Sequence, residues 1–359
     1  MYLGKGVSAA VNNVKDRIEQ ALVGLPVDEQ RIIDDAMIKL DGTPNKSELG
    51  ANAMLGASMA CLHAGATLHE LPLWKYIGGA SGGLMPVPML NILNGGAHAA
   101  SNVDVQEFMV MPHGFDTFQE GLRAGVETYH ALKAELKKDG LLGGVGDEGG
   151  FAPNLPANED GLKYMVRAIE GAGYSTEEIG IALDVASTEF LKDDGYHMDG
   201  KVLSSDDLVE LYGGWLDRYP ILSIEDGFGE DDWRGWSAFT KTYGHRVQTV
   251  GDDLFVTQSE RLSQGIELGA ANAMLVKVNQ VGTVSETLEA MDLASTNGMN
   301  NVVSHRSGES EDVTIADFAV GTRAGQIKTG APARSDRVAK YNQLLRIAED
   351  VHEYRSPFN

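Results

Sequence analysis

The sequence predicts an α/β fold, in which a (β/α)8-like barrel follows a smaller, mainly helical N-terminal domain. From about residue 179, short β-rich runs alternate with amphipathic helical segments, and such alternation is typical of a parallel sheet closed as a barrel. The segment before Pro86 has almost only helical patterns. The chain has 359 residues, of which 43% are hydrophobic, enough for one large barrel and a smaller domain.

The N-terminal part contains three predicted helices. Residues 7–23 carry apolar side chains at helical spacing up to Gly24, and residues 28–40 and 50–69 continue the helical pattern. The Gly- and Pro-rich stretch 81–88 is a candidate boundary. We therefore expect an N-terminal capping domain over 1–80 and a catalytic barrel domain over 81–359.

The barrel part contains six predicted strands with helices between them. The strands are expected at 179–184, 221–225, 248–252, 273–277, 301–305 and 325–328. The helices are expected at 205–218, 231–243, 257–268, 283–297 and 311–323.

Each of these six runs ends in a charged or titratable residue. These residues are Asp184, Glu225, Asp252, Lys277, His305 and Lys328. In a barrel of parallel strands, the C-terminal strand ends converge on one face, where active sites lie. Strands often end in polar residues on leaving a core, but three carboxylates in succession followed by Lys, His and Lys indicate a site.

The three successive carboxylates, Asp184, Glu225 and Asp252, predict a metal site. Three hard oxygen ligands suit Mg²⁺ rather than Zn²⁺. Lys277 follows a buried run, and a partly desolvated lysine near a metal can have a lowered pKa and act as a base. The alternative for Lys277 is a structural ion pair with Asp252 or Asp253.

Two further carboxylates, Glu148 and Glu107, are candidates for acid–base work. Glu148 lies in the Gly-rich run VGDEGG (145–150), whose glycines let the backbone approach a ligand. Glu107 lies in VQEFM, near the end of an early strand. Neighbours can split such a pair into acid and base roles. The alternatives are a surface turn for Glu148 and an ordinary strand-end charge for Glu107.

A candidate anion-binding segment follows the strand that ends at His305. Arg306 can hold a phosphate through two hydrogen bonds, and Ser307 and nearby backbone N–H groups add donors. His98, in the loop NGGAH (94–98), can lie over a bound anion. The alternatives are a capped loop for the first segment and a mobile surface histidine for His98.

The sequence resembles the enolase family essentially from end to end. The motifs that carry the resemblance are VGDEGG (145–150), SIEDG (223–227), GDDL (251–254), SHRSGE (304–309), QIKTG (326–330), NILNGG (91–96) and SDRVAKYNQ (335–343). The resemblance implies an enolase-type barrel, and reversible dehydration of 2-phospho-D-glycerate to phosphoenolpyruvate in glycolysis and gluconeogenesis.

The resemblance also implies the roles of individual residues. Asp184, Glu225 and Asp252 would hold Mg²⁺, which stabilises an enediolate, and Lys277 would remove the C2 proton. Glu148 would be the acid at the C3 hydroxyl, with Glu107 beside it. The residues implied in substrate binding are His98, Gln106, His305, Arg306, Ser307 and Lys328.

The start of the chain departs from the family pattern. Enolases begin with a strand-rich stretch and a Ser-Gly-Ala-Ser-Thr-Gly loop whose serine helps to bind a second Mg²⁺, whereas this sequence begins with the LGKG stretch that follows it. We therefore expect a truncated N-terminal domain, one complete Mg²⁺ site, a missing second-site loop and reduced activity.

Composition excludes several classes of partner. The net charge of −23 argues against nucleic acid as a main ligand. No apolar run is long enough for a membrane span, and the start lacks the pattern of a signal peptide. The single cysteine fits a reducing cytosol. The resemblance implies a small phosphorylated carboxylate substrate, a homodimer or higher homo-oligomer, and a cytoplasmic protein with surface or secreted pools.

Two other functions compete with an active enolase. A superfamily relative would act on another carboxylate as a racemase or sugar-acid dehydratase, but SHRSGE together with QIKTG argues against it. An inactive enolase-like binding protein is supported only by the unusual start.

Overall fold

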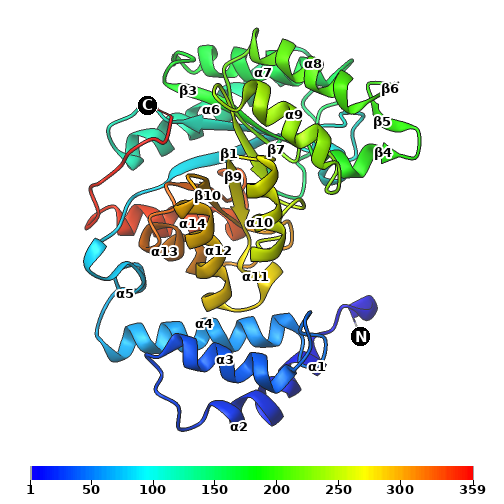
Figure 1. The fold of residues 1–359 in the computed structure, drawn as a ribbon. Helices are drawn as coiled ribbons and strands as arrows, with labels where there is room; N and C mark the ends of the chain where they lie inside the picture. The colour runs from blue at the N-terminus through cyan, green and yellow to red at the C-terminus, as the bar shows by residue number, and fades with distance from the viewer. Residues whose placement is uncertain (1, 359) are drawn as a thin grey trace.

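The computed structural model describes residues 2–358, and eight of its strands, which lie between residues 87 and 328, close into a barrel (Figure 1). The order around the barrel is β1-β11-β10-β9-β8-β7-β3-β2. The strands are β1 (Val87–Asn94), β2 (Glu107–Pro112), β3 (Ile179–Asp184), β7 (Ile221–Glu225), β8 (Gln248–Gly251), β9 (Ala273–Val276), β10 (Asn300–Ser304) and β11 (Gln326–Lys328). The predicted barrel and all six predicted strands are confirmed, with ends within one residue.

Helices follow the strands and cover the outside of the barrel. They are α6 (Phe118–Lys138), α7 (Asn158–Gly171), α8 (Ser205–Leu216), α9 (Trp233–Tyr243), α10 (Ser259–Leu268), α11 (Val278–Val281), α12 (Val284–Thr296), α13 (Thr314–Gly321) and α14 (Ser335–Ile347). Side-chain caps begin several of them: Ser204 accepts a hydrogen bond from the third residue of α8, and Thr283 does the same for α12. None of the helices within residues 2–358 is both long and apolar enough to cross a membrane.

Strand β2 departs from the parallel arrangement, because it pairs antiparallel with both β1 and β3. Its connection from β1, residues 95–106, holds only the short turn η4 (Gly96–His98) and no crossover helix, so the chain has to return in the opposite direction. Glu107 is consequently the first residue of β2, not a residue near its end as we expected. The reversal still brings Glu107 to the same rim as the last residues of the parallel strands.

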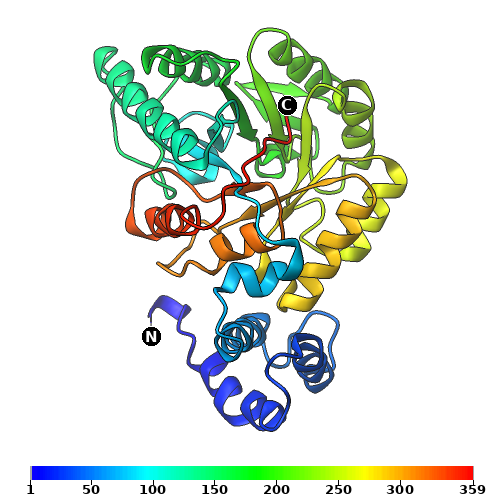
Figure 2. The ribbon, with the colours of Figure 1, turned by 90° about the vertical axis from the view of Figure 1, so that its left-hand side faces the viewer.

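The N-terminal helices form a separate layer beneath the barrel in Figure 1, and Figure 2 shows the same layer after a quarter turn. Residues 2–86 contain no strand, in agreement with the mainly helical domain expected. The elements are η1 (Tyr2–Gly4), α1 (Ser8–Asn13), the π-helical turn η2 (Val14–Ile18), α2 (Glu19–Leu22), α3 (Gln30–Asp41), α4 (Ala51–Leu68), α5 (Leu73–Gly78) and η3 (Gly79–Ser81).

A buried carboxylate joins the helical layer to the barrel. Asp34 on α3 is fully buried, accepts a hydrogen bond from Ser58 Oγ (2.6 Å) and another from the backbone N–H of Ser285 (2.9 Å). Ser58 Oγ also accepts from the N–H of Val284 (3.0 Å). The first N–H groups of α12, which no helix can satisfy internally, are thus capped by side chains of the other layer.

The two ends of the barrel differ in character. Its interior is packed with apolar side chains such as Met89, Met109 and Leu275, and Phe358 from the C-terminal tail packs against this core. A small antiparallel sheet of β4 (Leu191–Lys192), β5 (Gly195–Met198) and β6 (Lys201–Leu203) follows the short turn η5 (Ser187–Phe190) after β3. The charged residues gather at the end formed by the last residues of the parallel strands.

Candidate active site

Strand register places three carboxylates side by side at the rim. Glu107 on β2 is paired with Asp184 on β3, and Asp184 is paired with Glu225 on β7. Asp252 directly follows β8, the next strand around the barrel. All four are buried, with exposed fractions of 7% or less. The barrel therefore brings together carboxylates that are far apart in the sequence, as the strand ends predicted.

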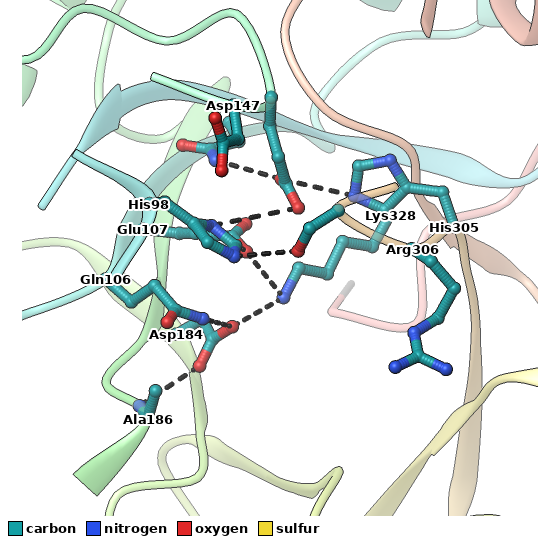
Figure 3. A network of polar contacts seen from close by, with 12 residues as sticks. His98, Gln106, Glu107, Asp147, Asp184, Ala186, His305, Arg306 and Lys328 are labelled. Carbon is teal, nitrogen blue, oxygen red and sulfur yellow. Dashed lines mark hydrogen bonds and ion pairs between the residues drawn. The ribbon is translucent and has the colours of Figure 1, made fainter. Parts of the chain in front are cut away.

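Lys328, the last residue of β11, points its ammonium group into this row of carboxylates (Figure 3). Its Nζ lies 2.8 Å from Asp184 Oδ2, 2.9 Å from Glu225 Oε1 and 3.3 Å from Glu107 Oε1. Burial by itself lowers the pKa of Lys328, but the surrounding carboxylates outweigh it and raise that pKa well above its ordinary value. The lysine is therefore charged and acts as the local counter-ion.

The carboxylates nevertheless exceed the positive charge around them. Burial, followed by the charge of Asp184, raises the pKa of Glu225 well above its usual range. Burial and the charge of Glu148 raise the pKa of Glu107 in the same way, and Glu107 Oε2 has no hydrogen-bond partner. Asp184 is different: burial raises its pKa, but Lys328 outweighs this and leaves the pKa lowered.

Glu148 approaches the same cluster from the loop 145–150. Burial raises its pKa, but His305, Lys328 and His98 together hold the pKa well below the usual range. The nitrogen or oxygen atoms with which His98, Glu107 and Glu148 could bind a metal ion lie within 4.8 Å of one another. Two neighbouring carboxyl groups thus have pKa values shifted in opposite directions, which is the arrangement that divides proton donors from acceptors.

Lys277 directly follows β9 and comes after the three proposed metal ligands in the sequence. Its side chain is 15% exposed, and its Nζ forms an ion pair with Asp252 Oδ2. Burial lowers the pKa of Lys277, but Asp252 and Glu225 together outweigh burial, so in the metal-free site the pKa is raised, opposite to the lowered pKa we expected. The ion pair with Asp252, our alternative for Lys277, is therefore present, and it does not remove Lys277 from the site.

The candidate anion-binding residues lie beside Glu148. His305 Nε2 is 3.2 Å from Glu148 Oε2, and His98 Nε2 is 2.8 Å from Ser307 Oγ. Arg306 and Ser307 are exposed, and the guanidinium group of Arg306 points away from Lys328 in Figure 3. Gln106 Nε2 donates to Asp184 Oδ2 at 3.4 Å.

One small cavity connects these groups. It measures about 40 Å³. It is lined by His98, Gln106, Glu107, Glu148, Asp184, Asp252, Lys277, Ser304, His305, Arg306, Ser307 and Lys328. Of the twelve residues predicted for the site, only Glu225 is absent from this lining, because it lies beneath the Lys328 ammonium group.

Four residues that support the site were not predicted. Ser304 lines the cavity, Asn91 Nδ2 donates to Glu148 Oε2 at 3.1 Å, and Asp226 accepts the backbone N–H groups of Asp252 and Asp253. Buried Arg337 contacts His305. Each lies in or beside a motif of the sequence analysis, so the motifs themselves were the signal that could have found them.

The predicted Mg²⁺ ligands are close but are not gathered around one point. Within residues 2–358, the groups whose donor atoms lie within 4.8 Å of one another are His98, Glu107 and Glu148, and Asp226, Asp252 and Asp253. The Lys328 ammonium lies between Asp184 and Glu225, and Lys277 holds Asp252. The assignment of Asp184, Glu225 and Asp252 to a metal stays a prediction.

Comparison with known proteins follows the same division of the chain. Residues 83–356 match the family model described as the enolase C-terminal TIM barrel domain, and residues 1–77 match the model of the enolase N-terminal domain. An enolase of Bifidobacterium animalis subsp. lactis (strain AD011) is 56% identical over 354 residues, covering 98% of this chain and 82% of the relative.

Proposed function

The chain belongs to the enolase family and is a phosphopyruvate hydratase, a carbon–oxygen lyase, and from this premise we propose how its residues divide the reaction. The substrate is 2-phospho-D-glycerate, and the products are phosphoenolpyruvate and water. One observation carries the proposal: a single cavity is lined by a strand-end lysine, two carboxyls with oppositely shifted pKa values, and a loop with Arg306 and Ser307. Proton removal, proton delivery and anion binding thus meet in one place.

Lys277 is the proposed base. The step uses the neutral amine, which requires release of the ion pair with Asp252. This amine takes the proton from C2, and the electron pair left on C2 spreads into the substrate carboxylate to give an enediolate. The position supports this role, because a short buried strand, Ala273–Val276, directs the side chain to the cavity and a hydrogen bond from its own N–H to Thr257 Oγ1 (3.0 Å) fixes the turn.

The pair of Glu107 and Glu148 is the proposed proton donor at C3. The electron pair of the enediolate forms the C2–C3 double bond, the C3–O bond breaks, and the departing hydroxide takes a proton to leave as water. In the substrate-free site the raised pKa of Glu107 places the shared proton there, while Glu148 is held ionised. Because the two groups are coupled, we assign the proton to the pair. His305 lies 3.2 Å from Glu148, and His98 lies 3.6 Å from Glu107 and 3.8 Å from Glu148.

Asp184, Glu225 and Asp252 are the proposed ligands of one Mg²⁺ ion. The fit rests on the hard oxygen donors and on the raised pKa of Glu225, which records a shortage of positive charge at this point. When bound, Mg²⁺ supplies positive charge that stabilises the negative charge developing on the substrate carboxylate.

Positive and polar groups at the rim are proposed to bind the substrate. Arg306 and Ser307 hold the phosphate, with His98 and His305 beside it, and Lys328 contacts the substrate carboxylate. Gln106 lies next to Asp184 and completes this set. The exposed side chain of Arg306 has to turn toward the cavity to do so.

Separating the two chemical steps tests these roles. Lys277→Ala should abolish exchange of the C2 proton with solvent deuterium, and Glu148→Gln should stop dehydration while C2 exchange continues, because base and acid act at different carbons. Exposed Lys241 on α9 offers a matched control, Lys241→Ala, that should leave both rates unchanged. Near-native exchange in Lys277→Ala would reject this lysine as the base.

The domain division, the cellular location and the oligomeric state of the protein are also proposals. We propose that the chain divides near residue 80 into a capping and a catalytic domain, that it works in the cytoplasm, and that it forms a homodimer or higher homo-oligomer. Analytical ultracentrifugation tests the last of these. The matches over both domains favour none of the superfamily dehydratase, racemase or non-catalytic alternatives.

A further inference from the structure

Arg337, near the start of α14, is a fully buried cation that does not line the active-site cavity. Its nearest carboxylate is that of its neighbour Asp336, with Oδ2 at 3.2 Å from Nε. Its remaining polar contacts are neutral groups. Burying a charge is costly unless the group is well hydrogen-bonded, so the positions of these neutral partners are closely tied to the guanidinium group.

Those partners belong to the two loops that form the acid and anion-binding parts of the site. Nη1 donates to the carbonyl oxygen of Arg306 (2.6 Å), and Nη2 donates to that of Ser307 (2.6 Å). Nη2 also donates at 3.5 Å to the carbonyl of Asp147, the residue before Glu148. One side chain therefore holds the backbone of the exposed anion-binding loop and reaches the loop that carries Glu148.

The fourth partner of Arg337 is the side chain of His305. Nη1 contacts His305 Nδ1, and a guanidinium group can only donate hydrogen bonds. Nδ1 must therefore accept, which places the proton of a neutral His305 on Nε2. That atom lies 3.2 Å from Glu148 Oε2, so the N–H group faces the carboxylate at ion-pair distance, without the geometry of a hydrogen bond. Burial lowers the pKa of His305 and Glu148 raises it, but the charges of Arg337 and Lys328 add to the effect of burial, so the pKa is lowered and the neutral ring is favoured.

Gly330 shows how closely the groups converge. It has φ of +83°, and a Cβ there would lie 2.8 Å from Arg337 Cδ, 3.1 Å from Glu148 O and 3.1 Å from His305 Cε1. Only glycine adopts this backbone freely and leaves room for all three residues. Any side chain at position 330 would therefore crowd Arg337 and His305, which contact each other beside Gly330.

We propose that Arg337 is a positioning residue of the dehydration site, which fixes His305 as the Nε2–H tautomer facing Glu148 and holds the Arg306–Ser307 backbone ready for the phosphate. This inference rests on the proposed function for its catalytic consequence, but the tautomer itself is a property of the substrate-free protein. Partners that orient a metal-binding histidine typically change affinity or activity by about 10- to 100-fold when they are removed, and we expect an effect of similar size here.

The first test needs no substrate. ¹⁵N NMR of histidine-labelled protein, with His305→Asn used to assign the signal, should show His305 neutral and protonated on Nε2. Arg337→Met should lose this single tautomer and raise the pKa of His305, since a positive neighbour is removed. A wild-type His305 protonated on Nδ1, or an unchanged tautomer in Arg337→Met, would overturn the proposal. If Arg337→Met does not fold, the wild-type spectrum and Arg337→Lys decide.

Kinetics and phosphate binding give the second test. Arg337→Met should lower kcat/KM by about 10- to 100-fold, weaken binding of inorganic phosphate and shift the acidic limb of the pH profile. Arg337→Lys, which keeps the charge and part of the donor set, should recover part of each effect. Arg346→Met, an exposed change on the same helix, should alter none of them. An inactive wild type with the expected tautomer would reject the proposed function alone, and equal losses in Arg337→Met and Arg346→Met would reject the positioning role.

Discussion

Replacing Lys328 by methionine should strongly destabilise the substrate-free protein, because the change removes a buried charge and keeps the length of the side chain. The ammonium group lies 2.8–3.3 Å from carboxylate oxygens of Asp184, Glu225 and Glu107. Removing one partner from a buried ion pair costs about 3–5 kcal/mol, since the other charge is left uncompensated. At about 2 °C per kcal/mol for a large domain, Tm should fall by roughly 6–10 °C.

The pH dependence of this defect has a definite sign. Raised pKa values of Glu107 and Glu225 mean that these two carboxyl groups bind protons more readily in the folded protein than in the unfolded chain. Lowering the pH through these raised values therefore stabilises the fold by neutralising the carboxyls, and the defect of Lys328→Met should shrink in acid. The pKa of Lys328 is also raised, so its own contribution is complete at neutral pH and is lost only when the pH rises through that raised value.

The assay is urea unfolding followed by circular dichroism, between about pH 5 and pH 8 and with a chelator present, so that metal does not replace the missing charge. Lys241→Met provides the matched control, because Lys241 is exposed. A loss below about 1 kcal/mol at neutral pH, or a defect that grows as the pH falls, would refute the view that Lys328 neutralises the carboxylate row.

Three other changes test separate parts of the structure. Chelation should abolish phosphoenolpyruvate formation measured by ultraviolet absorbance, and added Mg²⁺ should restore it; full turnover after thorough chelation would reject the metal assignment. Asp226→Asn should raise the Mg²⁺ concentration needed for half-activation by about 10- to 100-fold, since the residue positions Asp252 through backbone hydrogen bonds; an unchanged requirement would make Asp226 purely structural. Asp34→Ala should lower the free energy of unfolding, measured with a chemical denaturant, by about 2–3 kcal/mol, because the first N–H groups of α12 lose their cap. The exposed change Asp35→Ala should lower it little. Equal losses in the two variants would reject the view that Asp34 joins the helical layer to the barrel.

Most of the barrel was predictable because its signal is local. A short apolar run that ends in a charged residue marks both a strand and its functional end, and this pattern located Asp184, Glu225 and Lys328 correctly at the rim. The direction of β2 was not visible in the same way. The direction of β2 depends on whether residues 95–106 contain a crossover helix. The sequence of a Gly-rich loop does not predict the direction in which the chain leaves it.

The supporting residues were harder to predict for a different reason. Arg337 acts through contacts with backbone carbonyl groups of residues about 30 positions away, and such contacts leave no periodic pattern in the sequence. The pKa of Lys277 was misjudged because burial and Asp252 act in opposite directions, and their balance depends on a distance that only the fold sets. Residue type thus predicted which groups meet, whereas three-dimensional contacts decide their charge states.

The position of Lys328 links the net charge of the chain to the order of events in the site. A protein with net charge −23 has to gather positive charge locally to bind an anionic substrate, yet here the buried ammonium of Lys328 is already engaged by three carboxylates. Lys328 can turn to a substrate carboxylate only if another cation compensates Asp184 and Glu225. Divalent metal at these carboxylates would free Lys328, so it should strengthen substrate binding as well as the chemical step.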